Sequence, residues 1–230
     1  PPLAYIRRGL DPAQQGEPVR SDRPLGEDSM ASEDLALVAH LLRRAGFGAS
    51  RDELERYASK RYPEIVEDLL HPERFSEPQD DVLRRYYPEL LYMDAYTTWI
   101  GRWIYRMVNT QRPLEEKMAL FWHHVFAAGW GKSEHGPSAV IQIEAFRQMG
   151  LTDLRTILVG LSRDPMMIDW LDNNENHREE PNENYGRELL ELFSMGVGNY
   201  TEQDVKMAAR AFTGWTFVQP IPLYPYGPYA

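Results

Sequence analysis

Apolar side chains recur every three or four residues along most of this chain, which is the spacing that places them on one face of an α-helix. The clearest case is the stretch 181–217, PNENYGRELLELFSMGVGNYTEQDVKMAARAFTGWTF. It predicts one helix over about 183–195 and a second from Thr201. Gly196 and Gly198 separate the two, because glycine readily adopts the left-handed conformation that ends many helices. We expect the first helix to lie near the centre of the fold.

The predicted 183–195 helix has an apolar face. Leu189, Leu192 and Phe193 share it, so we expect all three to be largely buried. Thr201 is followed three residues later by Asp204, which is the spacing of a capping box at the start of the second helix.

The opposite face of the same helix is charged. Arg187 lies one turn after Glu183 and one turn before Glu191, so we expect it to pair with one of them, and Glu188 lies beside Glu191. If these groups are exposed, they contribute little to stability and indicate no function. If they are buried, they must neutralise one another, and such clusters often line functional sites. Because three carboxylates crowd around one cation, we expect Arg187→Ala to destabilise the fold by more than an exposed pair could.

The same periodicity predicts helices along the rest of the chain, and no segment alternates as a β-strand does. We therefore predict an all-α fold, a multi-helix globular domain over residues 32–217. The expected first or capping residues of the other helices are Ser32, Arg51, Pro63, Pro88, Pro113, Pro137, Thr152 and Asp164.

Two of these helices have a notable apolar stripe. In the helix from Pro63, we expect four apolar residues to point inward: Ile65, Val66, Leu69 and Leu70. In the helix over 88–109, large apolar residues follow one another every four positions: Leu91, Ala95, Trp99 and Trp103. Such an aromatic stripe is more often part of a core or an interface than of a cofactor site.

The two ends of the chain differ from the helical domain. We expect residues 1–31 to form an extended arm, and residues 218–230 to form an extended tail that is rich in proline and tyrosine. Both carry large apolar groups, namely Tyr5, Ile6, Tyr224, Tyr226 and Tyr229. Because proline reduces the entropy lost on binding, we expect both arms to lie on a partner protein or on the domain.

Composition limits the possible partners. The net charge of −10 argues against binding to nucleic acid, whose phosphates require a basic surface. No apolar run reaches the ~18–20 residues of a membrane span. Cysteine is absent, which excludes disulfides and thiolate chemistry. The chain begins PPLAYIRRGL, without an initiator methionine, so we expect a processed or trimmed product.

Candidate chemistry is sparse. The chain has neither a nucleophile elbow nor an H-E-x-x-H motif, and we predict no cofactor. Two interpretations of the histidines stay open. His123 and His40 could be ordinary residues of the core or the surface. Alternatively, they could be metal ligands. The best metal site that the sequence offers combines Glu188 and Glu191 with one of these histidines, brought in by tertiary packing.

Several blocks together resemble the mainly bacterial family catalogued as domain of unknown function 1800. They are HLLRRAGFG at 40–48, PLEEKMALFWHHVFAAG at 113–129, DPMMIDWLDNNEN at 164–176, and the 181–217 stretch. The resemblance implies a helical protein that is commonly exported, to the periplasm or cell surface, and often encoded beside a second uncharacterised exported family. It implies no established activity.

The sequence departs from the family pattern in two places. The family's tryptophan block usually reads W-H-x-H-F, whereas here Val125 takes the place of the second histidine, which weakens any metal role for that pair. Family members also continue beyond the motif at Gly214 and Trp215, whereas this acidic chain ends in its Tyr-Pro tail. We expect it to be either a fragment or the front portion of the domain.

Two functions therefore remain open. The first is a non-catalytic interaction or scaffold subunit, which binds other protein subunits through its extended arms and aromatic surface. The alternative is a metal-assisted or acid-base hydrolase that uses Glu188, Glu191, Arg187 and His123. Convergence of these side chains in a pocket would favour the enzyme, and their closure into a neutral network would favour the interaction subunit.

Overall fold

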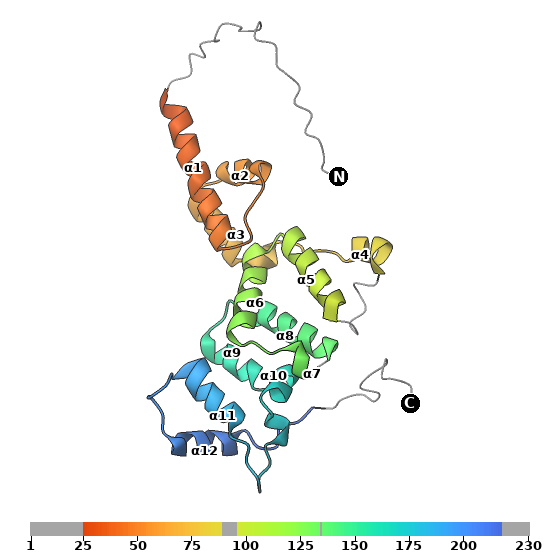
Figure 1. The fold of residues 1–230 in the computed structure, drawn as a ribbon. Helices are drawn as coiled ribbons and strands as arrows, with labels where there is room; N and C mark the ends of the chain where they lie inside the picture. Colours follow the sequence, from red (N-terminus) through yellow and green to blue (C-terminus); the bar gives the residue numbers. More distant parts are fainter. Residues whose placement is uncertain (1–24, 89–95, 134, 218–230) are drawn as a thin grey trace, which may run out of the picture.

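The computed structural model describes residues 25–88, 96–133 and 135–217, and helices dominate this part of the chain (Figure 1). No strand occurs among these residues, so the predicted all-α class is confirmed. The helices follow one another from the α1–α3 end of the molecule, through α5, α6 and α8 in the middle, to α11 and α12 at the opposite end (Figure 1).

The elements and their bounds, in chain order, are α1 (Leu25–Arg44), α2 (Arg51–Ala58), α3 (Tyr62–Leu70), the 3₁₀ turn η1 (Pro72–Arg74), α4 (Asp81–Tyr86), α5 (Tyr96–Asn109), α6 (Pro113–Val125), α7 (Trp130–Ser133), α8 (Gly136–Met149), α9 (Leu154–Leu161), α10 (Pro165–Trp170), the 3₁₀ turn η3 (Asn173–Glu175), α11 (Asn184–Glu188), the π-helix η4 (Leu189–Ser194) and α12 (Glu202–Ala211).

Most of the predicted helix starts are confirmed. Asp164 caps α10, and Thr201 caps α12 with the expected reciprocal capping box. The prediction that Thr152 caps α9 is wrong. Asp153 has that role, because its carboxylate accepts a hydrogen bond from the backbone N–H of Thr156 at 3.0 Å.

The N-terminal boundary also needs correction. Helix α1 begins at Leu25, not at Ser32, so residues 25–31 are helical and do not belong to an extended arm. Residues 1–24 and the tail at 218–230 lie outside the described residues, and so do the predicted contacts of their tyrosines. The described part of the aromatic helix, α5, begins at Tyr96, and Leu91 and Ala95 lie in an undescribed segment.

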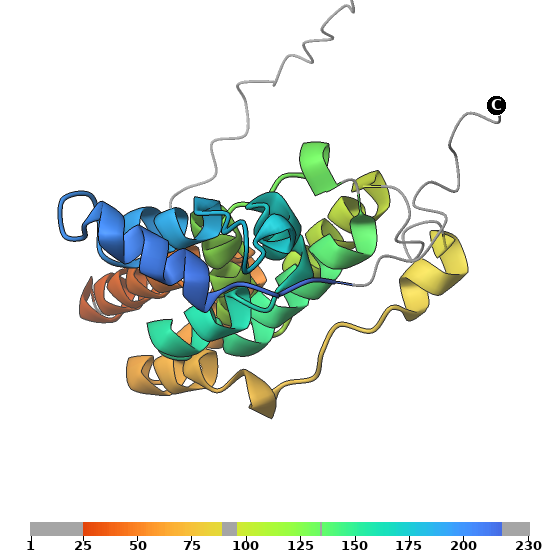
Figure 2. The same ribbon diagram turned by 90° about the horizontal axis from the view of Figure 1, so that it is seen from below.

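The main hydrophobic core lies where α5, α6, α8, α9, α10 and α11 meet, and Figure 2 shows these helices packed across one another. Helices α6 and α8 share the most extensive contact. The core is rich in aromatic and sulfur-containing side chains, including Trp103, Phe126, Phe146, Met167 and Tyr185. Trp103 thus belongs to the core, as its place in the aromatic stripe predicts.

A second, smaller cluster holds α1, α2 and α3 together. Its buried members are Val38, Leu42, Ile65 and Leu69. Leu114 of α6 packs against it and joins it to the rest of the molecule. The prediction that Leu70 points inward is wrong, because this last residue of α3 has 51 % of its surface exposed.

The predicted 183–195 helix lies at one end of the molecule and not near its centre, which contradicts our expectation (Figure 1). It also changes its winding partway along. It starts as α11 and continues as the π-helix η4, in which the N–H of Met195 donates to the carbonyl of Leu190, five residues back, at 2.9 Å. The wider turn rotates the side chains that follow. Leu189 and Phe193 still pack on the main core but are only partly buried, and Leu192 is 66 % exposed, which contradicts our expectation.

Candidate functional site

The charged face of α11 forms a surface link between two helices. Arg187 donates to Glu183 at 3.3 Å, which confirms one of the two predicted pairings, and also to both carboxylate oxygens of Glu202 at 2.9 and 2.8 Å. Glu191 accepts instead from the hydroxyl of Tyr200 at 2.6 Å. The Arg187 side chain is 34 % exposed. These groups therefore connect α11 to α12 at the surface and do not enclose a pocket.

The predicted metal ligands are not brought together. His40 is exposed on α1, and the ring of His123 packs edge-on against Trp103, with 5.4 Å between ring centroids. Neither is joined by a hydrogen bond or an ion pair to Glu188 or Glu191. In the part of the chain that the structure describes, no group of three or more His, Asp and Glu residues is arranged to hold a metal ion.

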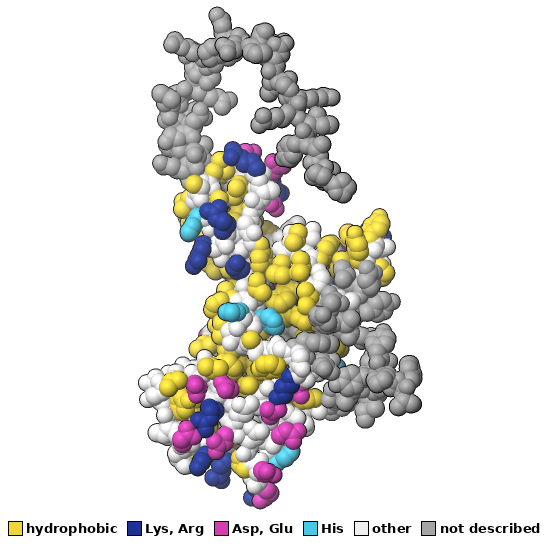
Figure 3. Space-filling model, viewed as in Figure 1, with side chains coloured by type: hydrophobic (Ala, Val, Ile, Leu, Met, Phe, Trp, Pro, Cys, Tyr) yellow, Lys and Arg dark blue, Asp and Glu magenta, His cyan; other side chains and the backbone are white. Residues whose placement is uncertain are grey.

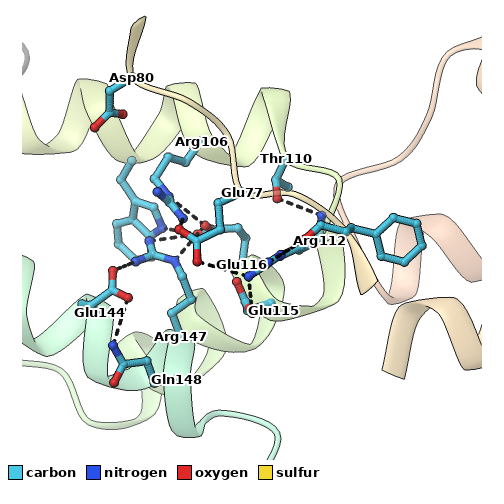
Figure 4. Close-up of polar contacts among 12 residues, drawn as sticks. Glu77, Asp80, Arg106, Thr110, Arg112, Glu115, Glu116, Glu144, Arg147 and Gln148 are labelled. Carbon is cyan, nitrogen blue, oxygen red and sulfur yellow. Dashed lines mark hydrogen bonds and ion pairs between the residues drawn. The ribbon is translucent and has the colours of Figure 1, made fainter. Parts of the chain in front are cut away.

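A charge cluster that the sequence analysis did not single out is buried between α5, α6 and α8 (Figure 4). Its centre is Glu116, whose side chain has no exposed surface. The carboxylate accepts hydrogen bonds from the Nε atoms of Arg106 and Arg147 at 3.1 and 2.8 Å, and from the indole of Trp103 at 3.1 Å. Two cations and one further donor thus neutralise a single buried carboxylate.

Less buried carboxylates complete this cluster. Glu144 pairs with Arg147, and Glu77 lies 3.8 Å from Arg106 and 3.2 Å from Arg112. Figure 4 shows the guanidinium groups pointing inward toward carboxylates from all sides. Each guanidinium and each carboxylate of the cluster therefore has a partner of opposite charge, so removing one of them would leave an uncompensated charge.

One signal in the sequence marks this network. Glu116 shares a helix face with Leu120, and Arg147 directly follows Phe146 on the inward side of α8. A charged residue at an apolar-face position is a candidate for a buried ion pair, but the partners lie on other helices. Periodicity on one helix could therefore not identify the pairs.

A second buried polar group lies between α6, α8 and α10. Asp164 accepts from the side-chain amide of Gln142 at 2.8 Å and from the backbone N–H of Met167 at 2.8 Å. Burial raises the pKa of Asp164 to about 6, because no cation faces it. Burial lowers the pKa of His123, which lies beside Gln142, and raises that of the Tyr185 hydroxyl.

Helix α5 has two neighbouring apolar faces. Trp99 and Trp103 face the main core. On the outer face, about 100° further round the helix, Ile100, Ile104 and Val108 follow one another every four residues, and Val108 has 76 % of its surface exposed. Figure 3 shows hydrophobic side chains gathered over the middle of the molecule, while charged side chains concentrate toward its ends.

The outer face of α5 borders a hollow of about 570 Å³, which we call the α5 hollow. It separates α5 from the α1–α2 end of the molecule. Most of its lining is apolar, and these residues are Leu42, Phe47, Tyr57, Ile104, Met107, Val108 and Pro113. Its size lies within the range of binding pockets in proteins, roughly 300–1,000 Å³. Among the features described, it offers the largest apolar surface for a partner.

A shallower apolar groove of about 450 Å³ lies between α9 and η4. Leu158, Val159, Leu189, Leu190 and Phe212 line it, and Arg155 adds a charge at its edge. The exposed side of the π-helix thus continues the apolar surface toward the α11–α12 end.

Comparisons with known proteins identify a family for this chain but do not indicate an activity. The model of the family described as "Protein of unknown function (DUF1800)" matches residues 40–226. No curated protein and no solved structure matches the chain. Among the described residues, no helix is both long and apolar enough to span a membrane.

Proposed function

This chain belongs to that family of proteins of unknown function, and we propose that it acts as an interaction subunit that docks another protein on the α5 hollow. The observation that carries the proposal is the outer stripe of α5. Ile104 and Val108 are 51 % and 76 % exposed, whereas Trp99 and Trp103 on the neighbouring face of the same helix pack on the core.

Exposed apolar residues are ordinary when they are scattered, but a continuous apolar patch beside a hollow is typical of a protein-binding surface. Here the α5 stripe faces Phe47, which is 42 % exposed, across the hollow. A partner that inserts apolar side chains there would remove both walls from water. Polar groups at the rim, such as Glu53 and Ser50, would then fix its orientation.

The alternative, a hydrolase built on Glu188, Glu191, Arg187 and His123, has no observation in its favour among the described contacts. Arg187 is occupied by Glu183 and Glu202, and His123 lies against Trp103 on the other side of the core. Glu191 accepts from Tyr200 at the surface, so the four predicted side chains do not converge in a pocket.

Site-specific photo-crosslinking tests this proposal. A photoreactive residue replaces Val108, and a matched control carries it at Val197, which is equally exposed at 78 % but lies in the turn between Gly196 and Gly198. The full chain is expressed in its native host and irradiated. We expect one discrete crosslinked protein from position 108 and none from position 197.

A second pair of variants checks that the surface itself is needed. Val108→Asp should abolish co-purification of the crosslinked partner, because a carboxylate in the hollow would lose its hydration on docking. Val197→Asp should leave co-purification unchanged. Equal crosslinking from both positions, or a partner that still binds Val108→Asp, would refute the assignment of the surface. A crosslink to a second copy of this chain would identify the interaction as self-association.

A further inference from the structure

A small cavity of about 130 Å³ lies among α7, the start of α8 and α10, apart from the α5 hollow. Four polar residues line it, namely Ser133, His135, Ser138 and Asp169. Ile141 and Met166 supply apolar walls. Serine, histidine and aspartate around one cavity are the residue types of a nucleophile, its base and the group that orients the base.

The contact between Ser138 and His135 has a defined polarity. The backbone N–H of Ser138 donates to Nδ1 of His135 at 3.3 Å, so Nδ1 is an acceptor and the neutral ring carries its proton on Nε2. The Ser138 hydroxyl lies 2.6 Å from the same Nδ1 and must therefore be the donor. Both contacts are made by the N-cap residue of α8, and the hydroxyl contact is the shorter of the two.

The third group is Asp169 of α10, which lines the same cavity. Burial raises the pKa of its carboxyl, while the nearby Lys132 and His135 act in the opposite direction. With Nδ1 occupied by Ser138, the Nε2–H of His135 is the remaining polar atom of the ring. Residues 135 and 138 also bring the positive end of the α8 dipole to the cavity, which favours negative charge there.

We propose that this cavity is an ester-hydrolysing site in which Ser138 is the nucleophile, His135 the general base and Asp169 a positioning residue. The Ser138 Oγ forms a bond to the acyl carbon and its proton moves to His135 Nδ1. The ester C–O bond then breaks, and the leaving alkoxide takes that proton. Water, activated by His135, hydrolyses the acyl-serine, releases the carboxylic acid and restores the hydroxyl. The small volume selects short acyl groups.

A fluorophosphonate with short alkyl groups tests the nucleophile directly, because its P–F bond is displaced by an activated serine and the adduct is stable. The full chain is treated and the labelled residue is identified by peptide mass spectrometry. We expect Ser138 to be labelled, and p-nitrophenyl acetate hydrolysis to fall in proportion to the labelled fraction. A folded wild-type chain with no adduct on Ser138 would overturn the proposal.

Three variants separate activation from mere accessibility. His135→Asn keeps a residue that suits the start of a helix but removes the base, so labelling should fall to background. Ser138→Ala should remove it completely. Ser162→Ala, which changes a serine that is buried like Ser138 but lies in the α9 groove, should label normally. Labelling of His135→Asn at the wild-type rate would refute the role of the base.

Asp169 is tested through rescue. Asp169→Asn should slow labelling by at least about tenfold, and Asp169→Glu should recover part of the loss, because the carboxylate and not the shape of the side chain orients the imidazole. Equal rates for the two variants would remove Asp169 from the assignment. Helical content and thermal midpoints confirm that each variant is folded.

Discussion

The two arginine–carboxylate clusters of this protein are built from the same chemical groups but lie in different surroundings. Around Glu116, Arg106 and Arg147 are almost fully withdrawn from water, and the carboxylate has no exposed surface. Around Arg187, the partner Glu202 has 68 % of its side chain exposed. The hydrogen-bond lengths of the two clusters are similar. We therefore expect them to differ in their effect on stability because of their exposure to solvent and not because of their geometry.

This comparison explains why the charged face of α11 is a poor candidate for a functional site. Water screens its charges, and either partner can return to solvent when the other is removed. The charges around Glu116 have no such alternative, since loss of one partner leaves an uncompensated charge inside the core. The dense charge pattern in the sequence therefore pointed to the Arg187 cluster, which we expect to contribute less to stability than the Glu116 cluster.

The largest effect is expected for Glu116→Gln. The substitution keeps the volume but leaves the two buried guanidinium groups with only the more exposed Glu144 and Glu77 as carboxylate partners, and we expect a loss of about 3–5 kcal/mol of unfolding free energy. Chemical denaturation measures it. The control Glu144→Gln removes the half-exposed partner of Arg147 and should cost far less. Similar losses for the two variants would show that burial does not separate these carboxylates.

Asp164 extends the comparison to a buried carboxylate that no cation faces. Its pKa is raised from 3.8 to about 6, so between these values the folded state holds a proton that the unfolded state has lost. The unfolding free energy should therefore fall as pH rises from about 4 to about 6, by roughly 2–3 kcal/mol. Asp164→Asn should remove this fall, because the neutral amide can still cap α10.

Other groups near Asp164 also affect how the unfolding free energy depends on pH, so the measurement needs a control. Gln142 and the backbone N–H of Met167 donate to it, and Tyr185 lies nearby. The lowered pKa of His123 acts with the opposite sign, because it makes the fold more stable as pH rises toward 6.5. The difference between wild type and Asp164→Asn at each pH isolates the carboxyl. A constant difference across this range would contradict the prediction.

The smallest effect is expected for Arg187→Ala. Its partners Glu183 and Glu202 face water, so the thermal midpoint should change little beside that of Glu116→Gln. This revises the expectation that Arg187 contributes more than an exposed pair. A decrease in thermal midpoint as large as that of Glu116→Gln would contradict this prediction and show that the charged face of α11 is important for stability.

The pattern of the chain predicts most of the helices and several of their first residues. Asp164, Thr201 and Pro113 start helices through contacts within a few residues, and such contacts are present in the pattern of the chain. The blocks that resemble the family are likewise local, and the family model covers them. The fold class follows from the same periodicity.

Which polar residues meet depends on how the helices pack together. Glu116 takes its partners from α5 and α8, and Asp169 reaches the cavity of Ser138 from a different helix. Leu192 turned outward because a π-helix changed the register that a regular α-helix would have kept. Burial and side-chain convergence depend on distant segments packing together, and the periodicity of one helix carries no information about its neighbours.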